Sequence, residues 1–113
     1  MPDQNVDVTF GFDPDGNTRF TFDPPEVPMR DKGRVIFHRR PANASWTFVV
    51  GIVKNDSAEQ FSSALRGDGK KLHIHDEHTE LGRYEYMIIV KLGGQYFPSP
   101  DPVIVNEPGM EAE

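Results

Sequence analysis

The chain has 113 residues, of which 36% are hydrophobic and 11% aromatic; this is enough apolar material for one hydrophobic core, and the length is too short for two. Its 18 acidic and 12 basic residues give a net charge of −6, so the average field of the chain repels phosphate backbones and anionic membrane surfaces. Because there is no cysteine, disulfides, thiolate metal sites and thiol nucleophiles are excluded. We expect one β-sandwich domain over residues 1–113 that binds neither nucleic acid nor a membrane.

We expect neither a secretory signal nor a membrane-spanning segment. The N-terminus lacks the basic region and apolar run of a secretory signal, and no segment approaches the ~18 apolar residues of a membrane span. These features predict a cytoplasmic protein, with residues 1–5 and 107–113 as flexible tails.

Alternating hydrophobicity predicts most strands of the first half. Residues 6–12 and 20–22 alternate apolar and polar side chains around a turn at 13–17, which indicates two strands joined by that turn. Residues 26–29 should run extended along a sheet edge, because the prolines around them cannot donate to a ladder. The almost wholly apolar run 46–53 predicts a central strand.

The second half predicts one helix among further strands. Residues 57–66 combine a possible N-cap at Ser57 with apolar residues at helical spacing, so we expect a short helix there. Leu72 and Ile74 should face the core of the next strand, which places His73 and His75 on its opposite face.

The end of the chain predicts two more strands. The longest covers residues 83–92 and ends at the hairpin turn Gly93-Gly94, and the last covers residues 103–105. Many short strands separated by turns predict an all-β fold, an antiparallel two-sheet sandwich with one short helix.

Two stretches resemble the cupredoxins. Residues 22–29, followed by Gly33, Val35 and Phe37, are similar to the Phe-x-Pro segment and first strands of that family. Gly82-Arg83-Tyr84-Glu85-Tyr86 resembles the strand that delivers its copper-binding cysteine. The resemblance implies a Greek-key sandwich, but not its copper centre, since Ile88 stands at the cysteine position and no histidine follows His78. We therefore expect no blue copper.

Two further resemblances concern the same half of the chain. In immunoglobulin-like domains a tyrosine at the start of a late strand bonds back to its own corner, and Tyr84 would be that residue, buried and bonded to nearby backbone. Asp101-Pro102 and Glu107-Pro108 resemble the paired signature of the DP-EP family of short bacterial proteins. That resemblance implies no known activity.

The densest set of ligand-type side chains is His73-Ile74-His75-Asp76-Glu77-His78. His73 and His75 project to one side of a strand, and His78 can complete a site for zinc, nickel, copper(II) or iron(II). With Gly67 and Glu80 the pair also resembles half of the first metal motif of cupins, although the second motif is missing. The alternative interpretation is a solvated polar loop without a metal.

Other catalytic patterns are missing. Ser57, Ser62 and Ser63 lack a nucleophile elbow, and residues 67–71 lack the spacing of a phosphate loop. The basic residues of 34–40 are interpreted as solvent-facing strand ends. Our leading interpretation is therefore a non-enzymatic binding or protein-interaction module without a cofactor, offering loops or a sheet edge to another protein or to itself. The alternative is a small metal-binding protein or cupin-like metalloenzyme that uses His73, His75 and His78.

Overall fold

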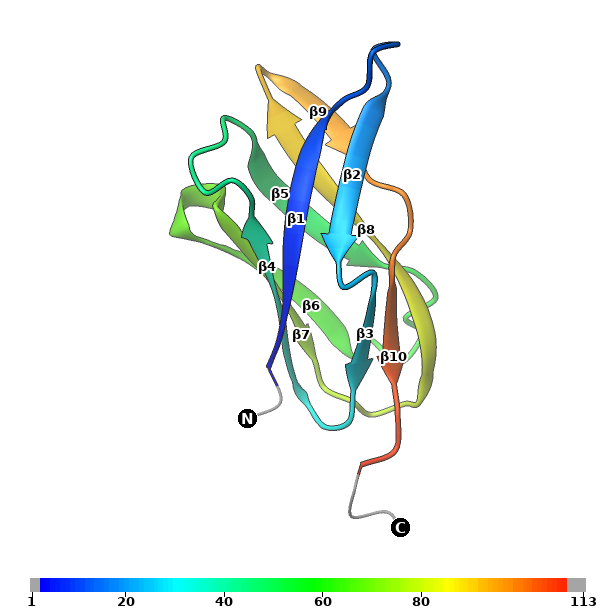
Figure 1. The fold of residues 1–113 in the computed structure, drawn as a ribbon. Coiled ribbons are helices and arrows are strands. Elements are labelled where there is room, and N and C mark those ends of the chain that lie inside the picture. Colours follow the sequence, from blue (N-terminus) through cyan, green and yellow to red (C-terminus); the bar gives the residue numbers. More distant parts are fainter. Residues whose placement is uncertain (1–2, 110–113) are drawn as a thin grey trace.

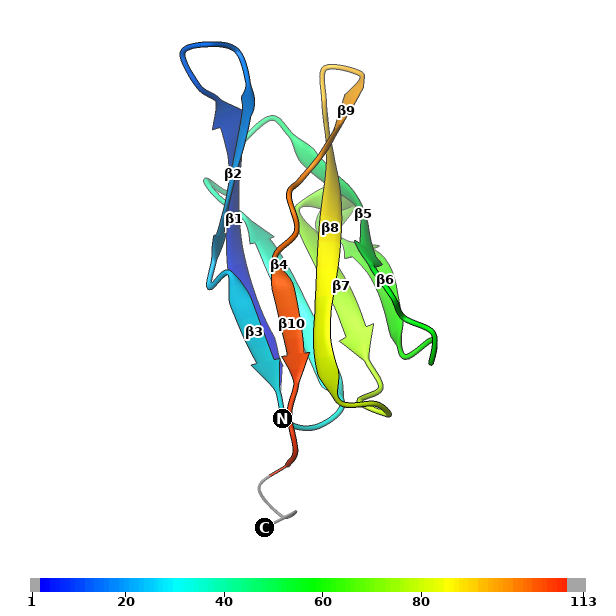
Figure 2. The same ribbon diagram turned by 90° about the vertical axis from the view of Figure 1, so that its right-hand side faces the viewer.

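The structure is a computed structural model, and it describes residues 3–109. These residues form two β-sheets packed face to face, and Figures 1 and 2 show the sandwich from two sides. The two inner faces enclose the core, in which fourteen residues are buried. The all-β two-sheet prediction is confirmed.

The first sheet has the strand order β2-β1-β4-β7-β6. Its strands are, in chain order, β1 (Gln4–Phe12), β2 (Thr18–Asp23), β4 (Gly33–Arg39), β6 (Phe61–Arg66) and β7 (Lys71–Asp76). Alternate side chains of β1, β4 and β7 face the core, as their period-2 pattern predicts. His73 and His75 lie on the outer face of this sheet, opposite the buried Leu72 and Ile74.

The second sheet has the order β3-β10-β8-β5, with β9 also paired to β8. Its strands are β3 (Glu26–Met29), β5 (Thr47–Val53), β8 (Gly82–Leu92), β9 (Gln95–Pro98) and β10 (Val103–Asn106). The long strand β8 pairs with β5 on one side and with β10 and then β9 on the other. The Gly93-Gly94 hairpin and the edge position of β3 agree with the sequence analysis.

The sheets are mixed rather than purely antiparallel, which corrects one part of the predicted fold class. β1 pairs with β4 in parallel, and β10 pairs with β3 in parallel. The reason is that the chain leaves the first sheet after β2, places β3 in the second sheet, and returns with β4 beside β1.

The predicted helix at 57–66 is wrong. Residues 61–66 form strand β6, and the helical structure in the described residues is the 3-10 turn η1 (Gly67–Gly69). The predicted N-cap at Ser57 is replaced by Asp56, which closes a single turn: its carboxylate accepts hydrogen bonds from the amides of Gln60 (2.9 Å) and Phe61 (3.1 Å). Glu59 then adopts a φ of 53°, which ends the turn, and pairing with β7 over its full length overrides the local helical spacing.

The apolar run predicted as a central strand is instead an edge. Strand β5 pairs only with β8 among the described residues, and its free side borders β6 of the other sheet. Phe48 faces the core, whereas Val50 and Ile52 face outward. The run is therefore apolar on both faces although only one face is covered by the sandwich.

Buried polar groups join the sheets at one end. The Asn106 amide of β10 donates to Gln60 Oε1 (3.2 Å) and to Asp76 Oδ1 (3.2 Å), both in or beside the first sheet. Tyr84 is 6% exposed, and its hydroxyl donates to the carbonyls of Glu80 and Leu81, each at 3.3 Å. The predicted burial and backbone bonding of Tyr84 are confirmed.

Parts of both predicted tails are ordered by contacts. Gln4 and Asn5 belong to β1, and the Glu107 amide donates to the Met29 carbonyl at 2.8 Å. Residues 1–2 and 110–113 of those tails lie outside the described residues. No helix in the described part of the chain is long and apolar enough to cross a membrane.

The buried carboxyl group of Asp76 gives a testable pH dependence. Its residue is 0% exposed, Oδ2 has no hydrogen-bond partner among the described residues, and burial raises its pKa against the opposing hydrogen bonds from the His78 amide and Asn106. Because the pKa of Asp76 is higher in the folded than in the unfolded chain, its protonated form stabilises the fold. This contribution to the free energy of unfolding is fully present below the unfolded-state pKa and is lost as pH rises through the folded-state pKa.

Asp76→Asn removes the ionisation and keeps an acceptor for the His78 amide. Urea unfolding at about pH 4 and about pH 7.5 should show the variant gaining stability relative to wild type as pH rises, on the order of 1–3 kcal/mol for an unpaired buried polar atom. Other titrating groups are common to both proteins and cancel in the difference. A difference that does not change with pH would contradict the assignment.

Candidate functional site

The structure brings two of the three predicted histidine ligands to one face and turns the third away. His73 and His75 both point outward from β7, and His75 Nε2 lies 3.0 Å from Glu77 Oε2. His78, with a φ of 58°, turns back toward the second sheet, where Nε2 lies 2.8 Å from the Met29 carbonyl. Among residues 3–109 there is no group of three or more histidine, aspartate or glutamate side chains arranged to hold a metal.

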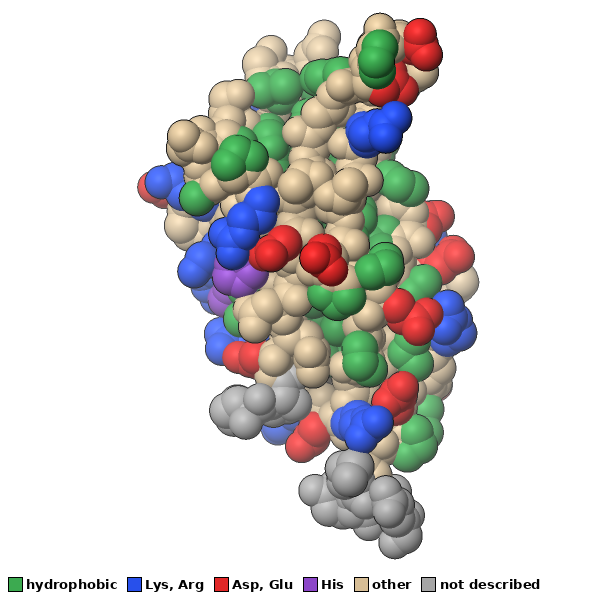
Figure 3. Space-filling model, in the orientation of Figure 1, with side chains coloured by type: hydrophobic (Ala, Val, Ile, Leu, Met, Phe, Trp, Pro, Cys, Tyr) green, Lys and Arg blue, Asp and Glu red, His purple; other side chains and the backbone are tan. Residues whose placement is uncertain are grey.

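The two outward histidines of β7 lie beside cations of β4 and β6. The register places Arg34 opposite His75 and Ile36 opposite His73, with His38 opposite Lys71. In Figure 3 the histidine side chains lie among lysine and arginine on the left of the view. Arg34 is held by Asp3 at 2.7 Å and Arg40 by Asp7 at 3.1 Å, so much of this positive charge is locally paired.

The pKa values of His73 and His38 are both lowered. Partial burial is the main cause for each, and nearby cations add to it: Arg34 and Arg66 for His73, and Arg40 and Lys71 for His38. Both imidazoles are therefore neutral at pH 7. A neutral imidazole can accept a hydrogen bond or bind a metal, but adds no positive charge to the surface.

One residue of the basic stretch was misinterpreted from sequence. Arg39 is 7% exposed rather than solvent-facing, and its guanidinium donates to the carbonyls of Trp46 (2.7 Å) and Ala42 (3.1 Å). It fixes the loop before β5. The period-2 pattern of this strand places residue 39 on the same inward face as Val35 and Phe37. That pattern is the sequence signal that could have identified Arg39 as buried.

A groove lies on the open side of the sandwich, where β5 and β6 come from different sheets. It has a volume of about 250 Å³. Its lining combines apolar, hydroxyl and carboxylate side chains: Gly51, Ile52, Val53, Asp56, Phe61, Ser62, Ser63 and Ile74. We call it the β5–β6 groove.

Gly51 sets how closely β5 approaches the first sheet at the β5–β6 groove. A Cβ at this position would lie 2.9 Å from Ile74 Cδ1 and 3.2 Å from a Leu72 methyl group. A side chain at this position would therefore force the end of Ile74 to shift, so glycine allows the close packing of β5 over β7.

The free edges of β5 and β6 both carry unpaired backbone groups. The Gln60 carbonyl accepts a hydrogen bond from the Glu77 amide, so the backbone groups of Ser62 and Ala64 face β7, and those of Ser63 and Leu65 point away from it. Of these outward groups, the Leu65 carbonyl accepts a hydrogen bond from Arg66 Nη1 at 2.9 Å. The Phe61 amide follows the same alternation: it points outward and is bonded by Asp56 Oδ2. By the same reasoning from the Lys54 amide and the Glu85 carbonyl, the backbone of Gly51 and Val53 points outward from β5.

Strand β6 lacks the features that usually protect a sheet edge. The other edge strands carry a proline in β3 and β9, charged residues in β2, and a bulge in β5 between Phe48 and Val50. The sequence Phe-Ser-Ser-Ala-Leu of β6 has none of these before Arg66 at its end. Sequence reasoning missed this edge because it assigned the segment to a helix.

No protein-family model matches the chain, and no curated protein is significantly similar to it in sequence. A function is therefore inferred from the geometry of the β5–β6 groove and of the outward histidines.

Proposed function

We propose that this chain is a non-enzymatic binding module that takes up an extended peptide segment along β6, at the β5–β6 groove. The observation that carries the proposal is an edge strand with outward backbone groups, no protecting residue before Arg66, and a groove beside it. In strand addition, main-chain hydrogen bonds supply affinity and adjacent pockets select alternate side chains.

The groove chemistry suggests which segments would fit. Phe61 offers partly exposed apolar surface for one side chain of the added strand, with the buried Ile74 behind it, and Ser62 and Ser63 offer hydroxyls. Asp56 lies at the beginning of β6, where its carboxylate is occupied by two backbone amides. We therefore expect the added segment to pair along Ser63 and the Leu65 amide, because the Leu65 carbonyl already accepts a hydrogen bond from Arg66 Nη1 at 2.9 Å, with an aliphatic residue placed toward Phe61.

The family resemblances are part of the same proposal. The bonding of the Tyr84 hydroxyl to the carbonyls of Glu80 and Leu81 supports the immunoglobulin-like corner, and the two-sheet architecture is compatible with a cupredoxin-like sandwich. Membership in the DP-EP family would imply no additional activity. A cupredoxin-like or immunoglobulin-like sandwich presents edges and loops for binding, but its function follows from the site and not from the fold.

Metal binding at the histidines is a second candidate function. The common face of His73 and His75, with the lowered pKa of His73, supports it, because a neutral imidazole is ready to ligate a divalent ion. His78 would have to give up its contact with the Met29 carbonyl to join them.

A proline at position 63 tests strand addition. The amide of Ser63 points away from β7, so Ser63→Pro leaves the β6–β7 ladder intact while removing an outward donor. Linear peptides selected from a random displayed library on the wild-type protein should bind the variant about tenfold or more weakly, by titration of the fluorescence of a labelled peptide.

Ser63→Ala is the matched control, because it removes the hydroxyl and keeps the amide. It loses only the hydroxyl that Ser63 offers to the groove, so it should bind the same peptides clearly more tightly than Ser63→Pro does. Equal binding to the proline variant, with its fold confirmed by circular dichroism, would exclude β6 as the docking edge, and so would a selection that yields no binder.

Calorimetric titration with zinc tests the second candidate. Wild type should bind more tightly than a His73→Ala, His75→Ala double variant, and the affinity should fall as pH drops and the imidazoles become protonated. Identical titrations for the two proteins would remove the metal hypothesis.

A further inference from the structure

The outer face of the second sheet is apolar at its centre. Val50 and Ile52 of β5 lie in register with Ile89 and Met87 of β8, and all four side chains point away from the core. On the far side of β8, Pro98 of β9 lies beside Ile89. Ile52 retains 43% exposure and the others are partly or largely exposed, so this band of the sheet faces solvent.

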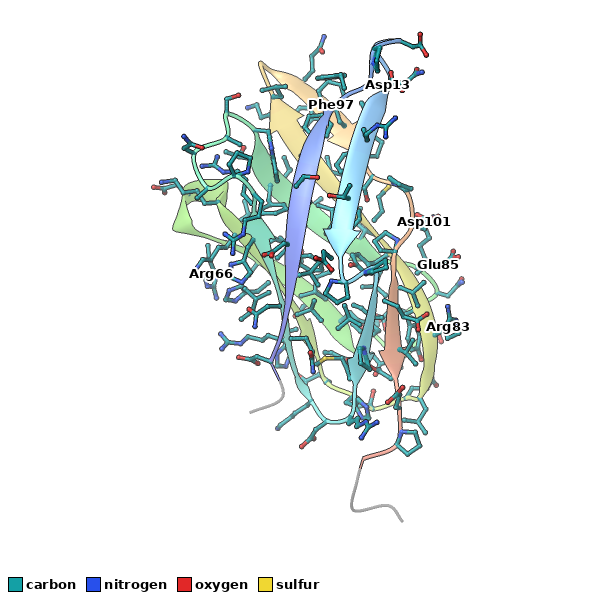
Figure 4. The ribbon with its side chains drawn as sticks, in the orientation of Figure 1. Asp13, Arg66, Arg83, Glu85, Phe97 and Asp101 are labelled. Carbon is teal, nitrogen blue, oxygen red and sulfur yellow. The ribbon has the colours of Figure 1, made fainter. Side chains whose placement is uncertain are left out.

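Charges border this apolar band in an ordered way. The outward residues of β8 are Arg83, Glu85, Met87, Ile89 and Lys91, so that Glu85 and Lys91 stand at equal distances on either side of Met87 and Ile89. Figure 4 labels Arg83 and Glu85 along β8 at the right of the view, with Asp101 above them.

The other charged side chains near this border form ion pairs, whereas Glu85 and Lys91 do not. Arg83 lies 2.8 Å from Glu26, and Lys54 lies 2.7 Å from Asp101. In the described chain neither Glu85 nor Lys91 has an ion-pair partner, although Lys91 Nζ lies 5.6 Å from the centre of the Tyr96 ring. Glu85 and Lys91 are too far apart along one strand to pair with each other, at about 20 Å by strand rise.

The order Glu85-Met87-Ile89-Lys91 is complementary to itself. If a second copy is stacked on the face with its β8 antiparallel and the two-fold axis at residue 88, Glu85 of each copy meets Lys91 of the other. Met87 then lies over Ile89, and on β5 Ile52 lies over Val50. A two-fold interface requires this kind of self-complementary pattern.

We propose that the second sheet is a dimerisation surface, on which two copies of this chain stack face to face through Met87, Ile89, Val50 and Ile52. The pairs of Glu85 with Lys91 fix the antiparallel orientation. The apolar band consists of Val50, Ile52, Met87, Ile89 and Pro98, whereas a standard interface takes about 20–30 residues from each partner. The dimer is therefore weak, reversible and dependent on protein concentration. The proposal does not rest on peptide binding at β6.

Charge reversal at the two border positions provides the test. Sedimentation equilibrium at low salt should show wild-type dimers, with a dissociation constant below about 1 mM. Glu85→Lys and Lys91→Glu should each weaken the dimer about fivefold or more, because each places like charges opposite one another. The double variant Glu85→Lys, Lys91→Glu restores both pairs and should return to within about twofold of wild type.

Three further proteins separate this interface from other routes of association. Met87→Glu places a charge in the apolar band and should abolish the dimer, whereas Glu59→Lys, a matched charge reversal on an exposed loop, should not change it. Ser63→Pro blocks edge pairing at β6 and should leave the dimer intact. A wild-type chain that stays monomeric at about 1 mM overturns the proposal. The proposal is also overturned if the double variant dimerises as weakly as the single variants. It is overturned as well if Ser63→Pro abolishes the dimer while the Glu85 and Lys91 variants leave its dissociation constant unchanged.

Discussion

The hydrogen bonds of Gln60, Asp76 and Asn106 tie the two sheets together at the end of the sandwich where β6 begins and β7 ends. Gln60 Oε1 accepts the amides of Thr79 (2.9 Å) and Glu80 (3.1 Å) as well as the Asn106 side chain, and all three polar residues are almost fully buried. Buried polar groups are costly unless they are paired, so this cluster allows few alternative arrangements of the chain around it. It fixes Gln60, and with Gln60 the start of β6.

The open side of the sandwich follows from that constraint. Between β5 and β6 the chain makes two turns, the second closed by Asp56, and then enters the other sheet instead of forming a hairpin with β5. Two consecutive strands therefore expose their edges to the same groove. A hairpin would have paired those backbone groups with each other and left no groove between them.

The sequence predicts well those features that depend on local alternation. Strands β1, β7 and β8, the outward position of His73 and His75, and the buried corner at Tyr84 all follow from period-2 patterns that one covered face imposes. The predicted helix at 57–66 failed because helical spacing in six residues is a weaker signal than a full ladder with β7. The parallel pairs of β1 with β4 and of β3 with β10 have no local signature, since they depend on where the chain crosses between sheets.

The candidate functional surfaces also differ in how far the sequence predicts them. The histidine cluster was visible because its residue types are distinctive, but its three-dimensional arrangement separates His78 from the other two. The edge of β6 and the apolar outer face of β5 and β8 consist of residue types that are common in any strand. They stand out only in the structure, where no further strand or sheet of the described chain covers them. The apolar run of β5 hints at the exposed face, because Val50 and Ile52 are hydrophobic although they are not part of the core. From sequence alone, however, a central strand explains the same run equally well, and only the sheet order separates the two explanations.

Amide hydrogen exchange measured by NMR shows whether β6 presents an unpaired edge. We expect slow exchange at Ser62 and Ala64, whose amides bond to β7, and fast exchange at Ser63 and Leu65, whose amides point into solvent beside the groove. Equal protection at all four amides would mean that the edge of β6 is already covered, and would exclude it as a free edge.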